Sequence, residues 1–117
     1  MDKQERRKWA RHDVDLGTTL APVDARGPAG SATIRNISPG GVCLSALLEI
    51  KPGTTIHLLL KSAVTARVLR SSLETPGPPC RWTLNCAFVK ALIDLEELLP
   101  SYCWLGGRLG DMQNDPQ

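Results

Sequence analysis

Short runs in which apolar and polar residues alternate fill most of the chain between positions 13 and 88, and they predict β-strands. Such alternation is typical of strands that pack one face on a core and leave the other in water. Six runs occur, and their regularly spaced positions are Val14, Leu16, Thr18 and Leu20; Ala32 and Ile34; Val42 and Leu44; Ile56, Leu58 and Leu60; Val64, Ala66 and Val68; and Trp82, Leu84, Cys86 and Phe88. Six short antiparallel strands favour a closed or nearly closed barrel, which leaves no exposed sheet edge.

Glycine and proline mark the connections between these runs. We expect turns at 27–30, at 36–41 and at 51–53, where the residue types favour chain reversal. The stretch from Glu74 to Pro79 holds three prolines and one glycine, so we expect a loop there. The fold class predicted is all-β, with the strands joined mainly by short connections.

The period of the apolar positions changes after the sixth run. One helical face collects Ala91, Leu92, Leu95, Leu98, Leu99 and Tyr102. Asp94 and Glu97 have the spacing of a capping box, and Pro100 is expected to kink or split the segment. We therefore predict a C-terminal α-helix whose apolar stripe either packs over a barrel end or contacts a partner, which includes a second copy in a homodimer. The polar residues 106–117 are expected to form a disordered tail.

The first twelve residues lack apolar periodicity and concentrate the positive charge of the chain. This segment contains Lys3, Arg6, Arg7, Lys8 and Arg11, against Asp2 and Glu5. We expect residues 1–12 to be a flexible basic arm that precedes a single domain at 13–105. A net charge of +2 over 117 residues is too small for a general nucleic-acid or membrane binder, so we expect no DNA or RNA partner.

Other function classes find little support in the composition. The chain has no apolar run long enough to span a bilayer and no signal peptide, so we expect a cytoplasmic protein without membrane insertion. The four cysteines lack C-x-x-C spacing, which disfavours a metal site and favours reduced thiols buried in a core. Ser38 has no linked histidine and no G-x-S-x-G context. We expect neither an enzyme nor a cofactor.

Two polar motifs in a fixed order carry the candidate chemistry. Arg7 and Arg11 form an R-x-x-x-R motif, and Asn36, Ser38 and Gly41 form an N-x-S-x-x-G motif. Guanidinium groups bind phosphate oxygens or the guanine edge through paired hydrogen bonds. A turn that contains glycine lets a ligand approach the main chain closely. The first motif is common by chance, whereas both together indicate a site for an anionic, guanine-containing ligand.

On these two motifs, between residues 5 and 102, the chain resembles the PilZ family of cyclic di-GMP receptors. The resemblance implies a six-stranded PilZ-type β-barrel and a bacterial receptor that links this second messenger to outputs such as motility and biofilm formation. It implies ligand contacts from Arg6, Arg7, Arg11, Asn36, Ser38, Gly40 and Gly41. Arginine at position 6 also favours binding of a stacked ligand pair in that family. Such a receptor would order its arm on binding ligand and signal to an unidentified downstream protein.

Plainer interpretations of the same residues stay open. Asn36 and Ser38 are typical turn residues that bond their own backbone, and surface arginines are often only solvated. Some PilZ-like proteins are adaptors that bind a motility or pilus-assembly protein without nucleotide. A barrel that binds single-stranded nucleic acid is disfavoured because aromatic residues make up only 4% of the chain.

Overall fold

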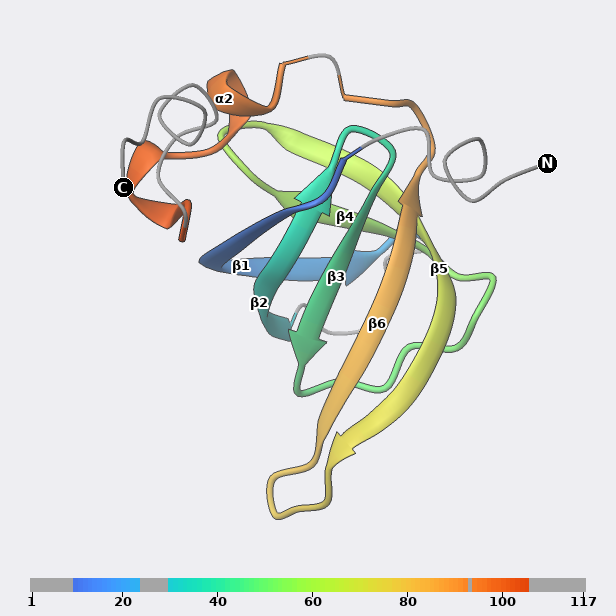
Figure 1. The fold of residues 1–117 in the computed structure, drawn as a ribbon. Coiled ribbons are helices and arrows are strands. Elements are labelled where there is room, and N and C mark those ends of the chain that lie inside the picture. Colours follow the sequence, from blue (N-terminus) through green and yellow to red (C-terminus); the bar gives the residue numbers. More distant parts are fainter. Residues whose placement is uncertain (1–9, 24–29, 93, 106–117) are drawn as a thin grey trace, which may run out of the picture.

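Six antiparallel strands form a closed ring in the computed structural model, which describes residues 10–23, 30–92 and 94–105 (Figure 1). The strand order around the ring is β1-β2-β3-β6-β5-β4, which confirms the predicted all-β barrel. The elements are β1 (His12–Pro22), β2 (Gly30–Ser38), β3 (Gly41–Ala46), β4 (Thr55–Leu59), β5 (Ala63–Thr75), β6 (Arg81–Phe88), α2 (Leu95–Leu98) and the 3-10 turn η1 (Ser101–Cys103). The expected turn at 27–30 lies outside the described residues except for Gly30, where β2 begins.

The interior of the ring is built from the apolar positions that the alternation predicted. The largest fully buried side chains include Leu20, Ile34, Leu44, Ile56 and Leu84, each less than 2% exposed. Burying an aliphatic side chain of this size stabilises the fold by about 1.5–3 kcal/mol, so the packed interior holds the strands in register. The outer faces of the strands carry polar side chains together with exposed apolar ones such as Leu59 and Leu69.

An irregularity in β2 changes which side chains reach the outer surface. Ile34 pairs with Leu44 and Asn36 pairs with Cys43, so Arg35 is an extra residue in β2 relative to β3. A β-bulge of this kind reverses the alternation at one point. Without it, Asn36 would share the inner face with Ile34. With it, Arg35 and Asn36 lie between the buried Ile34 and Ile37 with Arg35 exposed and Asn36 half-buried.

The β5–β6 hairpin extends beyond the ring. Only residues 63–67 of β5 pair with β4, while the pairing with β6 continues to Thr75 opposite Arg81. Figure 1 shows the two strands curving away together past the end of β3. The loop between β5 and β6 thus begins two residues later than predicted, because Glu74 and Thr75 belong to β5. Pairing with β6 extends β5 to a point that its own residue pattern did not indicate.

The C-terminal segment is less helical than its apolar stripe predicted. Helix α2 has four residues, and Pro100 separates it from η1, so the predicted split at Pro100 is confirmed. Asp94 is the N-cap residue, but its side chain makes no capping hydrogen bond. Leu95 and Leu99 are buried against the core, whereas Tyr102 is 81% exposed. The stripe therefore packs in part on the barrel, across one end of the ring (Figure 1).

The four cysteines are free thiols, but they differ in burial. Cys86 and Cys103 are buried as expected, Cys43 is half-buried, and Cys80 is exposed, so the prediction of core thiols was wrong for Cys80. Burial raises the pKa of the Cys86 thiol to about 12. Within the described part of the chain, no helix has the length and apolar character needed to cross a bilayer.

Candidate functional site

The turn between β2 and β3 is held by the side chain of Ser38. The backbone N–H groups of Gly40 and Gly41 both donate to Ser38 Oγ at 3.2 Å. Ser38 is only 6% exposed. A hydroxyl that accepts two backbone donors in a tight turn satisfies groups that the strand ladder leaves free. The interpretation of Ser38 as a residue that bonds the backbone of its own turn is thus correct. Ligand contact by Ser38 stays a prediction.

Gly41 is required by packing of the strands as well as by the motif. A Cβ atom built at Gly41 would lie 2.6 Å from the backbone oxygen of Cys86. Gly41 pairs with Ala87 on β6, so the short contact reflects close approach of β3 and β6. The backbone at this position therefore leaves no space for a side chain, whether or not a ligand binds nearby.

The two sequence motifs meet at the start of β1. Arg11 directly precedes β1, and its Nη1 donates to Asn36 Oδ1 at 3.4 Å across a sequence separation of 25 residues. The pairing of Asp13 with Asn36 brings the start of β1 beside the bulge of β2. At 3.4 Å this hydrogen bond is long, so a ligand could replace it at little cost. Arg6 and Arg7 lie outside the described residues, and their roles stay predictions.

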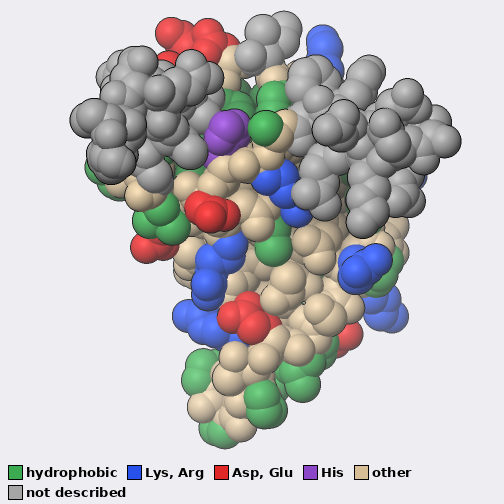
Figure 2. Space-filling model, in the orientation of Figure 1, with side chains coloured by type: hydrophobic (Ala, Val, Ile, Leu, Met, Phe, Trp, Pro, Cys, Tyr) green, Lys and Arg blue, Asp and Glu red, His purple; other side chains and the backbone are tan. Residues whose placement is uncertain are grey.

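A polar groove of about 630 Å³ begins at Asn36 and continues along the outer face of the barrel. Its volume lies within the roughly 300–1,000 Å³ of ordinary ligand sites. The lining residues are Asp13, Val14, Asp15, Thr33, Arg35, Asn36, Arg81 and Leu105. Figure 2 shows basic and acidic side chains gathered on this face of the molecule. We call this feature the outer-face groove.

Sequence reasoning did not find Arg35 and Arg81 as candidates for this site. Arg35 is the bulged residue of β2, and Arg81 opens β6 beyond the predicted loop. A possible signal was the position of Arg35 directly before Asn36, but strict alternation places these two residues on opposite faces. Only the bulge lets both line one groove.

Positive charge reaches the centre of this face. Burial raises the pKa of the Cys43 thiol, while Arg11 and Arg35 oppose that shift. Cys43 lies on β3 opposite Asn36. The guanidinium groups of Arg11 and Arg35 are therefore both close to Asn36. Asp13 and Asp15 supply nearby negative charge along the β1 wall of the groove. The outer-face groove can therefore bind an anionic group beside β2, where the arginines lie. It is less favourable to an anion beside β1, where the aspartates lie.

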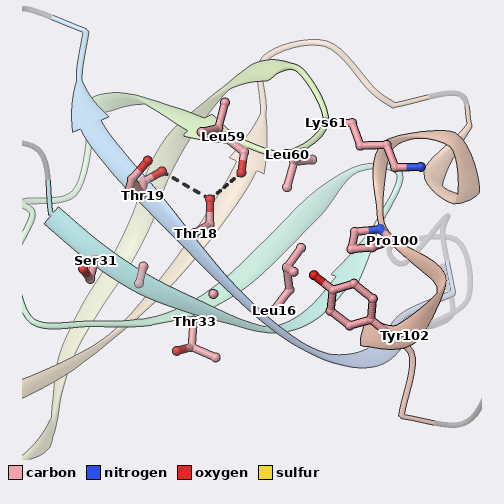
Figure 3. Close-up of a pocket in the computed structure, with 12 residues that line it drawn as sticks. Leu16, Thr18, Thr19, Ser31, Thr33, Leu59, Leu60, Lys61, Pro100 and Tyr102 are labelled. Carbon is pink, nitrogen blue, oxygen red and sulfur yellow. Dashed lines mark hydrogen bonds between the residues drawn. The ribbon is translucent and has the colours of Figure 1, made fainter.

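A second and more apolar groove, of about 680 Å³, lies where β1 diverges from β4 (Figure 3). Leu16, Leu60, Pro100 and Tyr102 line it in the close-up view. At its other end the Thr18 hydroxyl donates to the backbone oxygen of Leu59, which links β1 to β4. Of the motif residues that the structure describes, none lines this groove.

Comparison with known proteins gives a family match but no individual relative. Among the residues that the structure describes, no cluster of three or more His, Cys, Asp or Glu side chains could hold a metal ion. No curated protein and no solved structure matches the chain. A family model does match, over residues 5–103, and its description is PilZ domain. The match spans both sequence motifs and every strand of the ring.

Proposed function

The chain belongs to the PilZ domain family, and from this we propose that it is a receptor for cyclic di-GMP. Membership supports a role in cyclic di-GMP binding or as a PilZ-type adaptor, and domains of this family are binding domains rather than catalysts. The observation that most directly supports the receptor is the contact between Arg11 and Asn36, 3.4 Å apart. It joins the two halves of a bipartite motif on one surface beside a groove of suitable size.

The proposed mechanism uses the basic segment that precedes β1. Cyclic di-GMP has two phosphates, and the guanidinium of Arg11 can bind one of them through paired, charge-assisted hydrogen bonds. In the family-based proposal Arg7 and Arg6 add further contacts, which would draw residues 1–9 over the outer face. Ordering a segment in this way changes the surface that a partner protein meets. The downstream protein, the cytoplasmic location and links to motility or biofilm formation belong to this proposal.

Isothermal titration calorimetry with cyclic di-GMP, GTP and a short oligonucleotide tests the proposal. We expect saturable binding of cyclic di-GMP alone, micromolar or tighter, which is about −8 kcal/mol or better. Arg7→Ala and Arg11→Ala should each weaken binding by about 2–4 kcal/mol, because each abandons charge-assisted contacts. Arg67→Ala is a matched control, since Arg67 is an exposed arginine of β5, opposite β2 in the ring. Equal affinity of wild-type protein and the Arg11→Ala variant would remove Arg11 from the mechanism.

Tryptophan fluorescence tests the ordering step separately. The chain has three tryptophans, of which Trp9 lies in the basic segment and Trp82 and Trp104 lie in the described domain. If ligand draws residues 1–9 onto the barrel, cyclic di-GMP should change the emission of wild-type protein. Trp9→Phe should abolish most of that change, and Trp82→Phe should retain it. A change that survives in Trp9→Phe would argue for a rearrangement elsewhere.

The apolar groove supports a second candidate function. An adaptor that binds a motility or pilus-assembly protein without nucleotide needs exposed apolar surface, and this groove adjoins the exposed side chains of Leu59 and Tyr102. An adaptor should keep its partner in the Arg11→Ala variant and lose it in Tyr102→Ser. A receptor should show the opposite sensitivity for cyclic di-GMP.

A further inference from the structure

One arginine of the outer-face groove, Arg35, pairs with an acidic side chain from the β5–β6 hairpin, and a second, Arg81, bonds a serine of β3. Arg35 Nη2 lies 3.5 Å from Glu74 Oε2, and the Thr83 hydroxyl donates to Glu74 Oε1 at 3.1 Å. Arg81 Nη1 donates to Ser45 Oγ at 3.3 Å. Glu74 is at the end of β5, where the strand has left the ring, and the long guanidinium side chain of Arg35 spans the distance from β2.

These contacts cover a polar residue on the outer face of β3. Ser45 is 1% exposed although it alternates with the inward-facing Leu44 and Ala46. Hydrogen bonding from the Ser45 and Thr83 hydroxyls, together with Arg35 and Arg81, lowers the pKa of the Glu74 carboxyl below its usual value. Glu74 is therefore ionised at neutral pH, and its negative charge lies among the groups that would otherwise bind a ligand anion.

A carboxylate and a phosphate make the same kind of contact with guanidinium groups, so each can replace the other there. The groove connects this cluster to Asn36 without interruption, because Arg35, Asn36 and Arg81 line one volume. Asp13 and Asp15 repel a phosphate from the β1 wall. An anionic ligand that lies along the groove is thus directed from Arg11 and Asn36 toward the two arginines.

We propose that Arg35 and Arg81 form a second anion-binding subsite of the receptor, and that Glu74 occupies this subsite until a ligand phosphate displaces it. The inference rests on the proposed cyclic di-GMP binding and adds three residues that neither sequence motif contains. The ion pair of Arg35 with Glu74 is partly exposed, with side chains 52% and 29% accessible, so it is weak enough to be exchanged. Glu74 then acts as a specificity-determining residue that lowers affinity for weaker anions.

Calorimetric titration of charge-neutral variants with cyclic di-GMP, at one fixed salt concentration, tests the subsite. Arg35→Gln and Arg81→Gln should each weaken binding on the order of ten-fold, because a charge-assisted phosphate contact is lost. Glu74→Gln should tighten binding by about three-fold or more, since the competitor loses its charge. Arg67→Gln is the control and should bind as wild type does. The gain expected for Glu74→Gln cannot arise from misfolding, so it keeps the test valid if Arg81→Gln perturbs the hairpin.

The outcomes separate the two proposals. Suppose that wild-type protein binds cyclic di-GMP and that Arg35→Gln and Glu74→Gln bind it with the same affinity. This result would overturn the proposed subsite and leave the proposed receptor function standing. A Glu74→Gln variant that binds more weakly than wild type would also overturn it. Wild-type protein that fails to bind cyclic di-GMP would overturn both. Arg81→Lys adds a check, because it keeps the charge and should recover part of the affinity that Arg81→Gln loses.

Discussion

Residues of the two sequence motifs can contribute to the fold and to the proposed ligand binding in different proportions, and Ser38 and Arg11 are the two extremes. Ser38 is buried and accepts two backbone hydrogen bonds from the turn that follows it. Arg11 is exposed, and its hydrogen bond to Asn36 is long. We therefore expect a change at Ser38 to act mainly on stability and a change at Arg11 to act mainly on binding.

Ser38→Ala should lower the free energy of unfolding by about 1–2 kcal/mol, because the N–H groups of Gly40 and Gly41 lose their shared acceptor. Urea denaturation followed by circular dichroism measures the change. Thr65→Ala is a suitable comparison, since its hydroxyl bonds an exposed His57 on another strand. Equal stability of the Ser38→Ala variant and wild type would mean that water replaces the hydroxyl in the turn.

Arg11→Lys should leave the free energy of unfolding unchanged within about 0.5 kcal/mol, as is usual for an exposed side chain. It should nevertheless weaken cyclic di-GMP binding about ten-fold, because an ammonium group lacks the planar fork that binds two oxygens at once. Calorimetry and thermal denaturation of the same preparation provide both values. Full retention of affinity in this variant would indicate that Arg11 supplies charge alone.

At the scale of the elements, β3 and β6 approach each other too closely at Gly41 to admit a side chain. Gly41→Ala should destabilise the fold by about 1–3 kcal/mol, because its Cβ would lie 2.6 Å from the Cys86 backbone oxygen and one strand must move. Gly17→Ala is the matched control, since a Cβ on Gly17 of β1 meets nothing within 4 Å. Urea midpoints of the two variants test this difference, and equal midpoints would contradict it.

The six strands could be predicted because residues such as Ile34, Leu44 and Leu84 alternate with polar neighbours, and burial enforces that pattern. The bulge at Arg35 was not predicted, since the position of a one-residue insertion is decided by pairing with β3. For the same reason the sequence did not reveal the groove that Arg35 shares with Arg81. Glu74 was assigned to a loop because prolines and a glycine follow it closely, whereas the pairing of Leu73 and Thr75 with β6 keeps it within β5.

Helical periodicity misled the prediction for the C-terminal segment for a related reason. Leu95 and Leu99 are buried as a helical stripe requires, but Pro100 limits the helix to one turn. Cys103 and Trp104 are buried through η1 and the residue that follows it, whereas Ala91 and Tyr102 of the predicted stripe are exposed. Trp104 forms an isolated antiparallel β-bridge with Val14 of β1, close to the start of the site. Helical periodicity could not indicate this contact.

For the whole molecule, burial of thiols makes stability depend on pH in the alkaline range. Burial raises the folded-state pKa of Cys86 to about 12 from its ordinary value of 9.0, so the unfolded chain releases this proton first as pH rises. Below pH 9 the contribution of Cys86 to stability is complete, and it is lost as pH rises toward 12. The loss has a slope of up to about 1.4 kcal/mol per pH unit for one thiol.

Urea denaturation at pH 8, 9 and 10 measures this slope. Cys86→Ala should reduce the steepness of the decline relative to wild type, whatever its effect on stability at pH 8. Cys80→Ala should leave the steepness unchanged, because Cys80 is exposed. Identical slopes in wild type and Cys86→Ala would show that another group dominates alkaline unfolding.

If the β2–β3 turn serves the ligand as proposed, as well as the fold, this has a consequence for how relatives of this chain would diverge. In a lineage that gave up its nucleotide, selection for a folded barrel would still retain the equivalents of Ser38 and Gly41, since the turn and the β3–β6 contact need them. The equivalents of Arg11 and Asn36 would drift. Survival of the serine and glycine in such a descendant would therefore say little about whether it still senses the messenger.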